Sequence, residues 1–161
     1  MCLLFVVSSP LLAAQEEEIS KAHLHNLEGY NLLKEENYQE AIACFQKAIE
    51  FDPEFATAYN NLGSAYYNLD KYDKAIEQFK KVIELEEDYT KAYFNLASAY
   101  FWEREFRKAY SYYRRAEECD KEYVEERKDI EKARTKIETE LEKNPDDKRL
   151  QRIYNRLSEM D

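Results

Sequence analysis

The chain repeats itself at an interval of 34 residues, and this limits the folds open to it more than any other feature. When the sequence is shifted by that interval, small residues align with small residues and bulky ones with bulky ones. A fixed period of this length is typical of architectures in which each unit packs on its neighbours. Two small columns are Gly29, Gly63, Ala97 and Ala41, Ala75, Ala109; two aromatic columns are Tyr38, Tyr72, Phe106 and Phe45, Phe79, Tyr113.

Each unit reads as two helices joined by a short polar break. In the second unit, apolar residues recur every three or four positions over 59–69 and again over 72–83, a spacing that places them on one helical face. In the first unit, Asn37 with Glu40 three residues later matches a capping box and predicts a helix start. Because one hairpin leaves an apolar face exposed, the hairpins are expected to stack.

The composition supports helices and excludes several functions. The 161 residues include only 2 Gly and 3 Pro, and the net charge is −10. Without a Lys/Arg cluster in so acidic a chain, we expect no binding to nucleic acid or to anionic membranes. Cys2, Cys44 and Cys119 have no CxxC spacing, which argues against zinc and redox motifs. Cys44 and Cys119 are predicted to be buried free thiols.

The columns resemble those of the tetratricopeptide repeat (TPR). The resemblance is clearest in Ala58-Tyr59-Asn60-Asn61-Leu62-Gly63-Ser64-Ala65-Tyr66, followed by the stretch 72–79. It covers residues 22–123 as three units, 22–55, 56–89 and 90–123. It implies an all-α fold, an α-solenoid of three TPR helix-turn-helix hairpins plus C-terminal capping helices. The first unit departs from the pattern, with Glu28 where the others have Leu62 and Leu96, so Leu24 and Leu27 are expected to supply its apolar contact.

Residues 124–161 lose the repeat columns but still read as helical. An apolar stripe is followed by a break at 144–147, where an early Pro and acidic residues predict a new helix. One-sided apolar helices are suited to cover the open end of a repeat stack, so we interpret 124–161 as capping helices. The alternative is a helix that docks a partner or dimerises. The apolar stripes are Ile130, Ala133, Ile137, Leu141, and Leu150, Ile153, Tyr154, Leu157.

The first 14 residues are apolar and uncharged, unlike the rest of the chain. The stretch is too short to span a bilayer, which needs ~20 apolar residues. It is typical of the apolar region of a signal peptide with Ala13-Ala14 before cleavage, although no Lys or Arg precedes it. We therefore expect export to the periplasm or the exterior, with residues 15–21 as a linker. Without a functional signal, the protein would be cytoplasmic.

The resemblance implies that the first helix of each hairpin lines a concave binding groove. The candidate residues there include no Asp or Glu, although the chain is strongly acidic, and several are aromatic. Such a surface is typical of a protein-binding site. It predicts a peptide or helical segment with apolar side chains, neutral to mildly acidic; the competing interpretation is that Phe101 and Trp102 pack under the C-terminal helix. The groove candidates are Asn26, Tyr30, Thr57, Asn60, Asn61, Ser64, Tyr67, Lys91, Phe94, Asn95, Ser98, Phe101 and Trp102.

Some TPR modules hold the acidic C-termini of heat-shock chaperones in a two-carboxylate clamp of Lys and Asn. Carried over to this chain, the clamp would need Lys at Asn26, Asn at Tyr30 and a basic residue at Asn95. Only Asn61 and Lys91 match the clamp. The sequence therefore predicts that the groove is not a chaperone-tail clamp.

Catalysis is not expected. The two histidines, His23 and His25, are two residues apart on a predicted helix and point to nearly opposite sides, so they cannot share a metal. With 2 Gly there is no typical phosphate loop, and no Ser or Cys lies in a nucleophile motif. We expect no metal and no cofactor. The predicted function is a protein-interaction scaffold; the alternative is a structural, self-associating scaffold that forms a homo-oligomer through the C-terminal helix.

Overall fold

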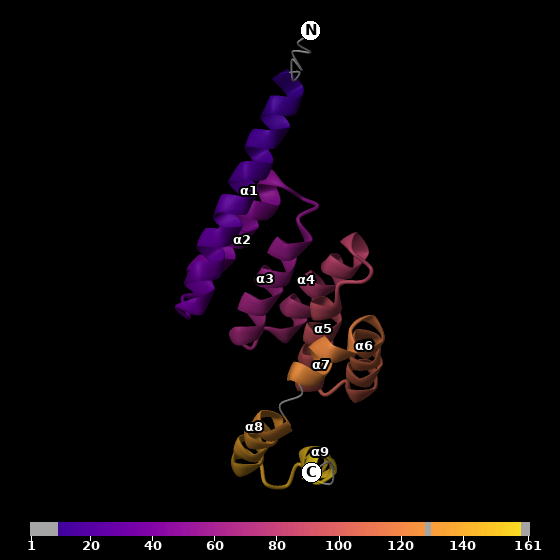
Figure 1. The fold of residues 1–161 in the computed structure, drawn as a ribbon. Coiled ribbons are helices and arrows are strands. Elements are labelled where there is room, and N and C mark those ends of the chain that lie inside the picture. Colours follow the sequence, from indigo (N-terminus) through magenta and orange to yellow (C-terminus); the bar gives the residue numbers. More distant parts are fainter. Residues whose placement is uncertain (1–9, 128–129, 159–161) are drawn as a thin grey trace. The chain divides into compact units, whose positions relative to one another are not determined.

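The computed structural model describes residues 10–127 and 130–158, and all the regular secondary structure in that part is α-helical (Figure 1). The chain divides into two compact units, Met1–Asp120 and Lys121–Asp161, which are described here one at a time. The first nine residues of the predicted signal peptide lie outside the described residues, whereas Pro10–Ala14 form the start of the first helix. Among the described helices, none is long and apolar enough to cross a membrane.

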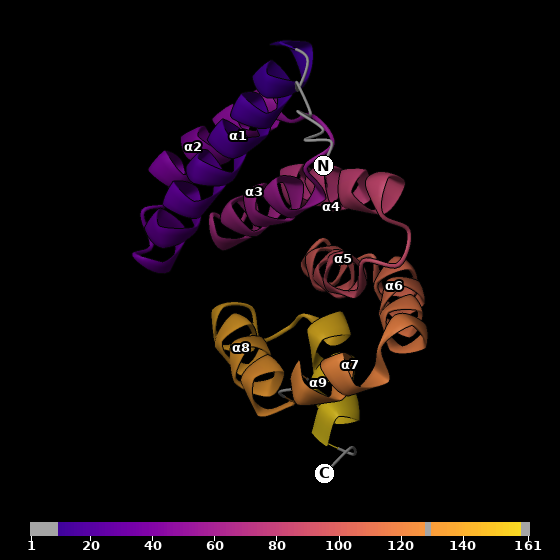
Figure 2. The same ribbon diagram turned by 45° about the horizontal axis from the view of Figure 1, so that its top comes forward.

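The first unit is built from three successive hairpins. Within each hairpin the two helices pack against each other, and the second helix of one packs on the first helix of the next (Figures 1 and 2). This confirms the predicted all-α solenoid of three helical hairpins. The first helices are α1 (Pro10–Lys34), α3 (Ala56–Asn68) and α5 (Thr90–Trp102); the second helices are α2 (Tyr38–Phe51), α4 (Tyr72–Leu85) and α6 (Phe106–Cys119).

The three hairpin turns have one shared construction. In each, a single residue adopts the left-handed conformation: Glu36 with φ 63°, Asp70 with φ 55° and Arg104 with φ 62°. The amide of the following residue donates back into the first helix, for example from Lys71 to the Tyr66 carbonyl at 3.0 Å. This bond satisfies a carbonyl at the helix end and reverses the chain within a few residues.

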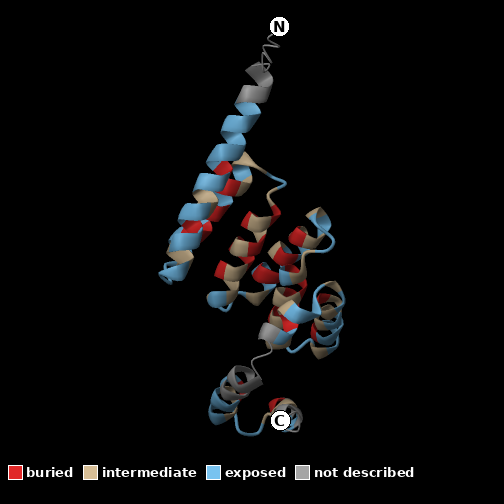
Figure 3. Ribbon diagram, in the orientation of Figure 1, coloured by how far each residue is buried: buried red, intermediate tan, exposed pale blue. Residues whose placement is uncertain are grey.

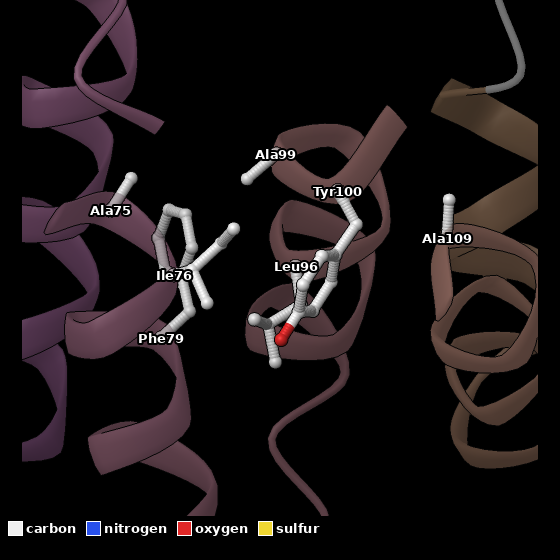
Figure 4. Close-up of a cluster of buried hydrophobic side chains, with 7 residues drawn as sticks. All are labelled: Ala75, Ile76, Phe79, Leu96, Ala99, Tyr100 and Ala109. Atoms are coloured by element: carbon white, nitrogen blue, oxygen red, sulfur yellow. The ribbon is translucent and has the colours of Figure 1, made fainter. Parts of the chain in front are cut away.

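The buried residues lie where neighbouring helices face each other (Figure 3). A Cβ added to Gly63 would lie 2.6 Å from Cε1 of Phe79 in α4. The repeat therefore has a small residue at this position because α3 and α4 are in direct contact there. The largest cluster joins α4, α5 and α6 (Figure 4). It contains Ala75, Ile76, Phe79, Leu96, Ala99, Tyr100 and Ala109.

Three expectations about the N-terminal half are wrong. Residues 15–21, predicted as a linker, are part of α1, because this stretch is rich in Glu and contains neither Gly nor Pro to interrupt the helix. A helix does start directly after Asn37, as predicted, but Asn37 makes no side-chain cap bond, and its Nδ2 donates to the Glu35 carboxylate. Leu24 and Leu27 do not fill the place of the missing leucine at Glu28, because they point outward and are 64% and 57% exposed.

The second unit contains α7 (Lys121–Arg127), α8 (Ile130–Lys143) and α9 (Lys148–Ser158). The break predicted at 144–147 is present, and the Asp147 carboxylate accepts a bond from the Leu150 amide at 3.2 Å, capping α9. α8 and α9 pack together, and the Tyr154 hydroxyl donates to Glu138 at 2.6 Å. Ile137 and Leu150, one from each predicted stripe, are buried. The capping role of this unit stays a prediction.

Candidate protein-interaction surface

The first helices α1, α3 and α5 are neighbours along one side of the first unit (Figure 2). We call the side formed by these three helices the first-helix face. All thirteen residues predicted for the groove lie on these helices. The repeat period places equivalent residues at equivalent heights on adjacent helices, so the face is assembled from matching positions of three units.

Two asparagine pairs join the first helices to one another. Asn61 of α3 donates from Nδ2 to Oδ1 of Asn26 in α1 at 2.9 Å, and Asn95 of α5 donates in the same way to Asn60 of α3 at 3.1 Å. The residues of each pair are 35 positions apart, so the second pair repeats the first one unit later. An amide nitrogen carries two hydrogens and the oxygen two lone pairs, so each pair keeps hydrogen-bonding capacity beyond the bond it makes.

Asn60 differs from the other members of these pairs. Only 7% of its surface is exposed, whereas Asn26, Asn61 and Asn95 are half-buried. It was predicted as a groove residue, but its burial means that its side chain mainly positions Asn95. The sequence did not separate the two roles, because Asn60 and Asn61 are adjacent and both polar.

An aromatic cluster lies at the C-terminal ends of α3 and α5. The Trp102 indole N–H donates to the Tyr67 hydroxyl at 2.8 Å, and the Trp102 ring meets Phe101 edge-on at 5.3 Å. Burial raises the pKa of Tyr67; the bond from Trp102 opposes this rise and the Asp70 carboxylate adds to it. Trp102 is thus held by its own hairpin and the preceding one.

One member of this cluster was missed by the sequence. Tyr72, the first residue of α4, stacks on Trp102 with ring centroids 6.4 Å apart and meets Tyr67 edge-on at 5.4 Å. Its hydroxyl donates to Asp70 at 2.5 Å. The only signal in the sequence is that Tyr72 belongs to the aromatic column of Tyr38, Tyr72 and Phe106, and this pattern does not distinguish a residue that packs on Trp102 from one buried within its own hairpin.

The remaining predicted residues differ in how much they expose. Tyr30 is 43% exposed and Lys91 is exposed, while Thr57 and Phe94 are half-buried. The hydroxyls of Ser64 and Ser98 donate to carbonyls four residues earlier in their own helices, at 2.9 and 3.1 Å. These serines therefore offer acceptors, rather than donors, to a ligand.

Other features of the described residues do not point to chemistry. In that part of the chain, no three His, Cys, Asp or Glu side chains are arranged to hold a metal ion. His23 stacks on Phe55 at 4.5 Å and His25 on Phe51 at 5.6 Å. Cys44 and Cys119 are free thiols, but both are half-buried rather than buried as predicted, and burial raises the pKa of each.

Comparison with known proteins identifies the repeats. A profile described as "TPR repeat" matches residues 29–70, and two described as "Tetratricopeptide repeat" match residues 56–89 and 90–123. The small glutamine-rich tetratricopeptide repeat-containing protein beta of Homo sapiens and that of Mus musculus are each 42% identical to the chain over 60 residues. That match covers 37% of this chain and 20% of each relative, so the chain spans only a fifth of the length of these relatives.

Solved TPR structures share the fold at low identity. The first TPR of Spaghetti (RPAP3), bound to the HSP90 peptide SRMEEVD, is 23% identical with a TM-score of 0.64, over 88% of this chain and 94% of that one. The TPR2B domain of yeast Sti1, in a complex with an Hsp70 peptide, is 21% identical with a TM-score of 0.63, over 88% and 99%. The matched profiles together run from residue 29 to residue 123, more than half of the chain. The chain therefore belongs to the tetratricopeptide-repeat family.

Proposed function

We propose that the protein is an interaction scaffold that binds a peptide segment of another protein on its first-helix face. The observation that carries the proposal is the pair of asparagine bridges, Asn26 to Asn61 and Asn60 to Asn95, repeated at both junctions between first helices. An extended peptide has an amide and a carbonyl at every residue, and a row of side-chain amides can pair with both. The TPR structures described as peptide complexes support the same class of function.

The chemistry of the face indicates which segment fits. The thirteen candidates include no acidic residue, and Lys91 is their one cation. The C-terminal ends of α3 and α5 carry a rigid aromatic surface made of Tyr67, Phe101 and Trp102. Such side chains lose little conformational entropy when a ligand binds. We propose a ligand with apolar side chains and a neutral to mildly acidic charge. No catalytic step is part of this function.

A chaperone tail is not the proposed ligand. Asn26, which accepts a bond from the Asn61 amide, stands where a carboxylate clamp needs a lysine. Lys91 alone is exposed and correctly placed. One lysine can pair with one carboxylate but cannot supply the second half of a clamp.

Selection from a phage-displayed library of random peptides on the full chain, followed by fluorescence anisotropy with the selected peptide, tests the proposal. Asn61→Ala should weaken binding by about tenfold, the effect of losing one or two hydrogen bonds. Gln46→Ala is the matched control, because it removes an exposed amide from the second helix α2. Equal affinities for the wild type and Asn61→Ala, with a loss in Gln46→Ala, would place binding on the other side of the repeats.

A further inference from the structure

The outer side of α1 carries a pair of leucines that the described part of the first unit, residues 10–120, leaves uncovered. Leu24 is 64% exposed and Leu27 57% exposed, and α1 shows exposed surface along most of its length (Figure 3). Two large apolar side chains one helical turn apart form a continuous apolar spot. Exposed spots of this kind commonly mark a contact with another molecule.

This side of α1 is not built to receive another hairpin of the same kind. In α3, Leu62 and Ala65 pack on α2, and the equivalent residues of α5 pack on α4 in the same way. In α1 the equivalent residues are Glu28 and Asn31, both exposed and polar. Leu24 also stands where α3 has the fully buried Ala58, and its greater bulk would hold a preceding hairpin away.

The two leucines belong to a longer pattern along α1. Positions 17, 20, 24, 27, 31 and 34 are separated alternately by three and four residues, the spacing of the contact positions in a coiled coil. All six side chains are exposed. We call this set the α1 stripe; it consists of Glu17, Ser20, Leu24, Leu27, Asn31 and Lys34.

The α1 stripe is complementary to itself when two helices run antiparallel. In the register that places Leu24 of one copy opposite Leu27 of the other, Ser20 faces Asn31 and Glu17 faces Lys34. Opposite charges therefore meet at both ends of the contact, around an apolar centre. A parallel arrangement would place Glu17 opposite Glu17 and Lys34 opposite Lys34, which is unfavourable.

We propose that the protein associates with a second copy of itself through the α1 stripe, as an antiparallel, two-fold symmetric pair. A two-fold interface uses one surface patch twice, so a self-complementary stripe is what such an interface requires. The contact lies on α1 and uses neither α3 nor α5. The stripe shares α1 with the groove candidates Asn26 and Tyr30 but contains none of the thirteen groove residues. Variants of the stripe and variants of the groove therefore change different side chains, and either proposal can fail alone.

The contacts that the two charged residues make within their own helix do not prevent this association. Glu17 pairs with Lys21 at 2.6 Å, and the Lys34 ammonium lies 5.6 Å from the centre of the Tyr30 ring. Both contacts are on exposed surface, where such interactions contribute little. Either residue can turn to a partner at small cost. Since only two leucines per copy form the apolar centre, we expect dissociation constants on the order of 100 μM.

Sedimentation equilibrium of the full chain, from about 10 μM to about 1 mM protein, tests the proposal. The wild type should move from monomer to dimer over this range. Leu24→Ala with Leu27→Ala should weaken the dimer at least about tenfold, because the apolar centre is lost. Both leucines are exposed, so this variant should keep its circular-dichroism spectrum and melting temperature.

Charge reversal tests the antiparallel register. Glu17→Lys alone and Lys34→Glu alone each place like charges together at both ends, and each should weaken the dimer about threefold to tenfold. Combining the two reversals restores opposite charges and should return the affinity to near the wild-type value. Glu40→Lys, an exposed change on α2, is the matched control and should have no effect.

Three outcomes would overturn the proposal. The first is a monomer at every concentration. The second is a dimer that the leucine changes leave unaltered, above all one that is lost on deletion of residues 144–161. The third is a combined charge reversal that is as weak as, or weaker than, the single reversals.

Discussion

The ring of Phe79 lies so close to Gly63 that any side chain at position 63 would collide with it. A Cβ built on Gly63 falls 2.6 Å from Cε1 of Phe79, and one on Gly29 falls 2.7 Å from Cε1 of Phe45. The same contact thus sets the closest approach of the two helices in the first and second hairpins. Since both phenylalanines are almost completely buried, they have little room to move aside.

Gly63→Ala should therefore destabilise the protein by about 1–3 kcal/mol, the usual cost of overpacking. In an exposed helix the same change would stabilise by roughly 1 kcal/mol, so the expected sign is opposite to that of helix propensity. Urea unfolding followed by circular dichroism measures the difference. Phe79→Leu should remove part of the clash. The double variant Gly63→Ala with Phe79→Leu should therefore lose less unfolding free energy than the two single variants combined.

Arg104→Gly should stabilise the protein by about 0.5–1 kcal/mol. Arg104 has φ 62°, where a side chain costs about 1–2 kcal/mol and glycine does not, although glycine loses part of this gain through its freedom in the unfolded chain. Thermal melting compares Arg104→Gly with Gln46→Gly, a change inside α2 that should destabilise by about 1 kcal/mol. If both variants lost the same amount of stability, the left-handed conformation of Arg104 would not be a source of strain.

Asn95→Ala should destabilise the protein by about 1–2 kcal/mol, because it removes the donor to the buried Asn60 oxygen. Changing both residues to alanine should cost less than the two single losses combined, since no buried acceptor is then left without a donor. Denaturant unfolding of the four proteins gives the coupling energy. A coupling energy of zero would mean that the bond between the two amides does not form in solution.

Much of the fold could be predicted because its determinants are local and repeated. The pairing of the two helices in each hairpin could be predicted, since a small residue must face a large one at a close contact. The small residues are Gly29, Gly63 and Ala97, and Phe45 and Phe79 are the large ones that face the two glycines. The hairpin turns follow from the same period. Family resemblance then indicated which helix of each pair lines the binding face.

The errors concern what lies next to a helix rather than the helix itself. The spacing of Leu24 and Leu27 suits a buried face equally well, and only the three-dimensional structure shows that both side chains are largely exposed. Asn37 and Glu40 have the spacing of a capping box, and α2 begins directly after Asn37, but the Asn37 side chain makes no cap bond and its Nδ2 donates to the Glu35 carboxylate. The role of Tyr72 depends on a contact with Trp102 in the next hairpin, which spacing within one unit cannot reveal.

The HSP90 peptide SRMEEVD should bind this protein much more weakly than a peptide selected from a random library. The clamp requires several cations at fixed positions, and of these only Lys91 is present. Fluorescence anisotropy with the free-acid and the C-terminally amidated forms of the peptide should give equal, weak signals. Tight binding that amidation abolishes would show that a carboxylate clamp exists after all.

The most direct test of the central claim is the position of a bound peptide on the protein. Titrating the isotope-labelled full chain with a library-selected peptide and recording ¹H–¹⁵N correlation spectra reports on every amide, including the side chains of Asn26, Asn61 and Asn95 and the indole of Trp102, the one tryptophan. We expect the largest shifts at these side chains and along α3 and α5. Shifts concentrated on α2, α4 and α6, with these side chains unchanged, would contradict a binding site on the first-helix face.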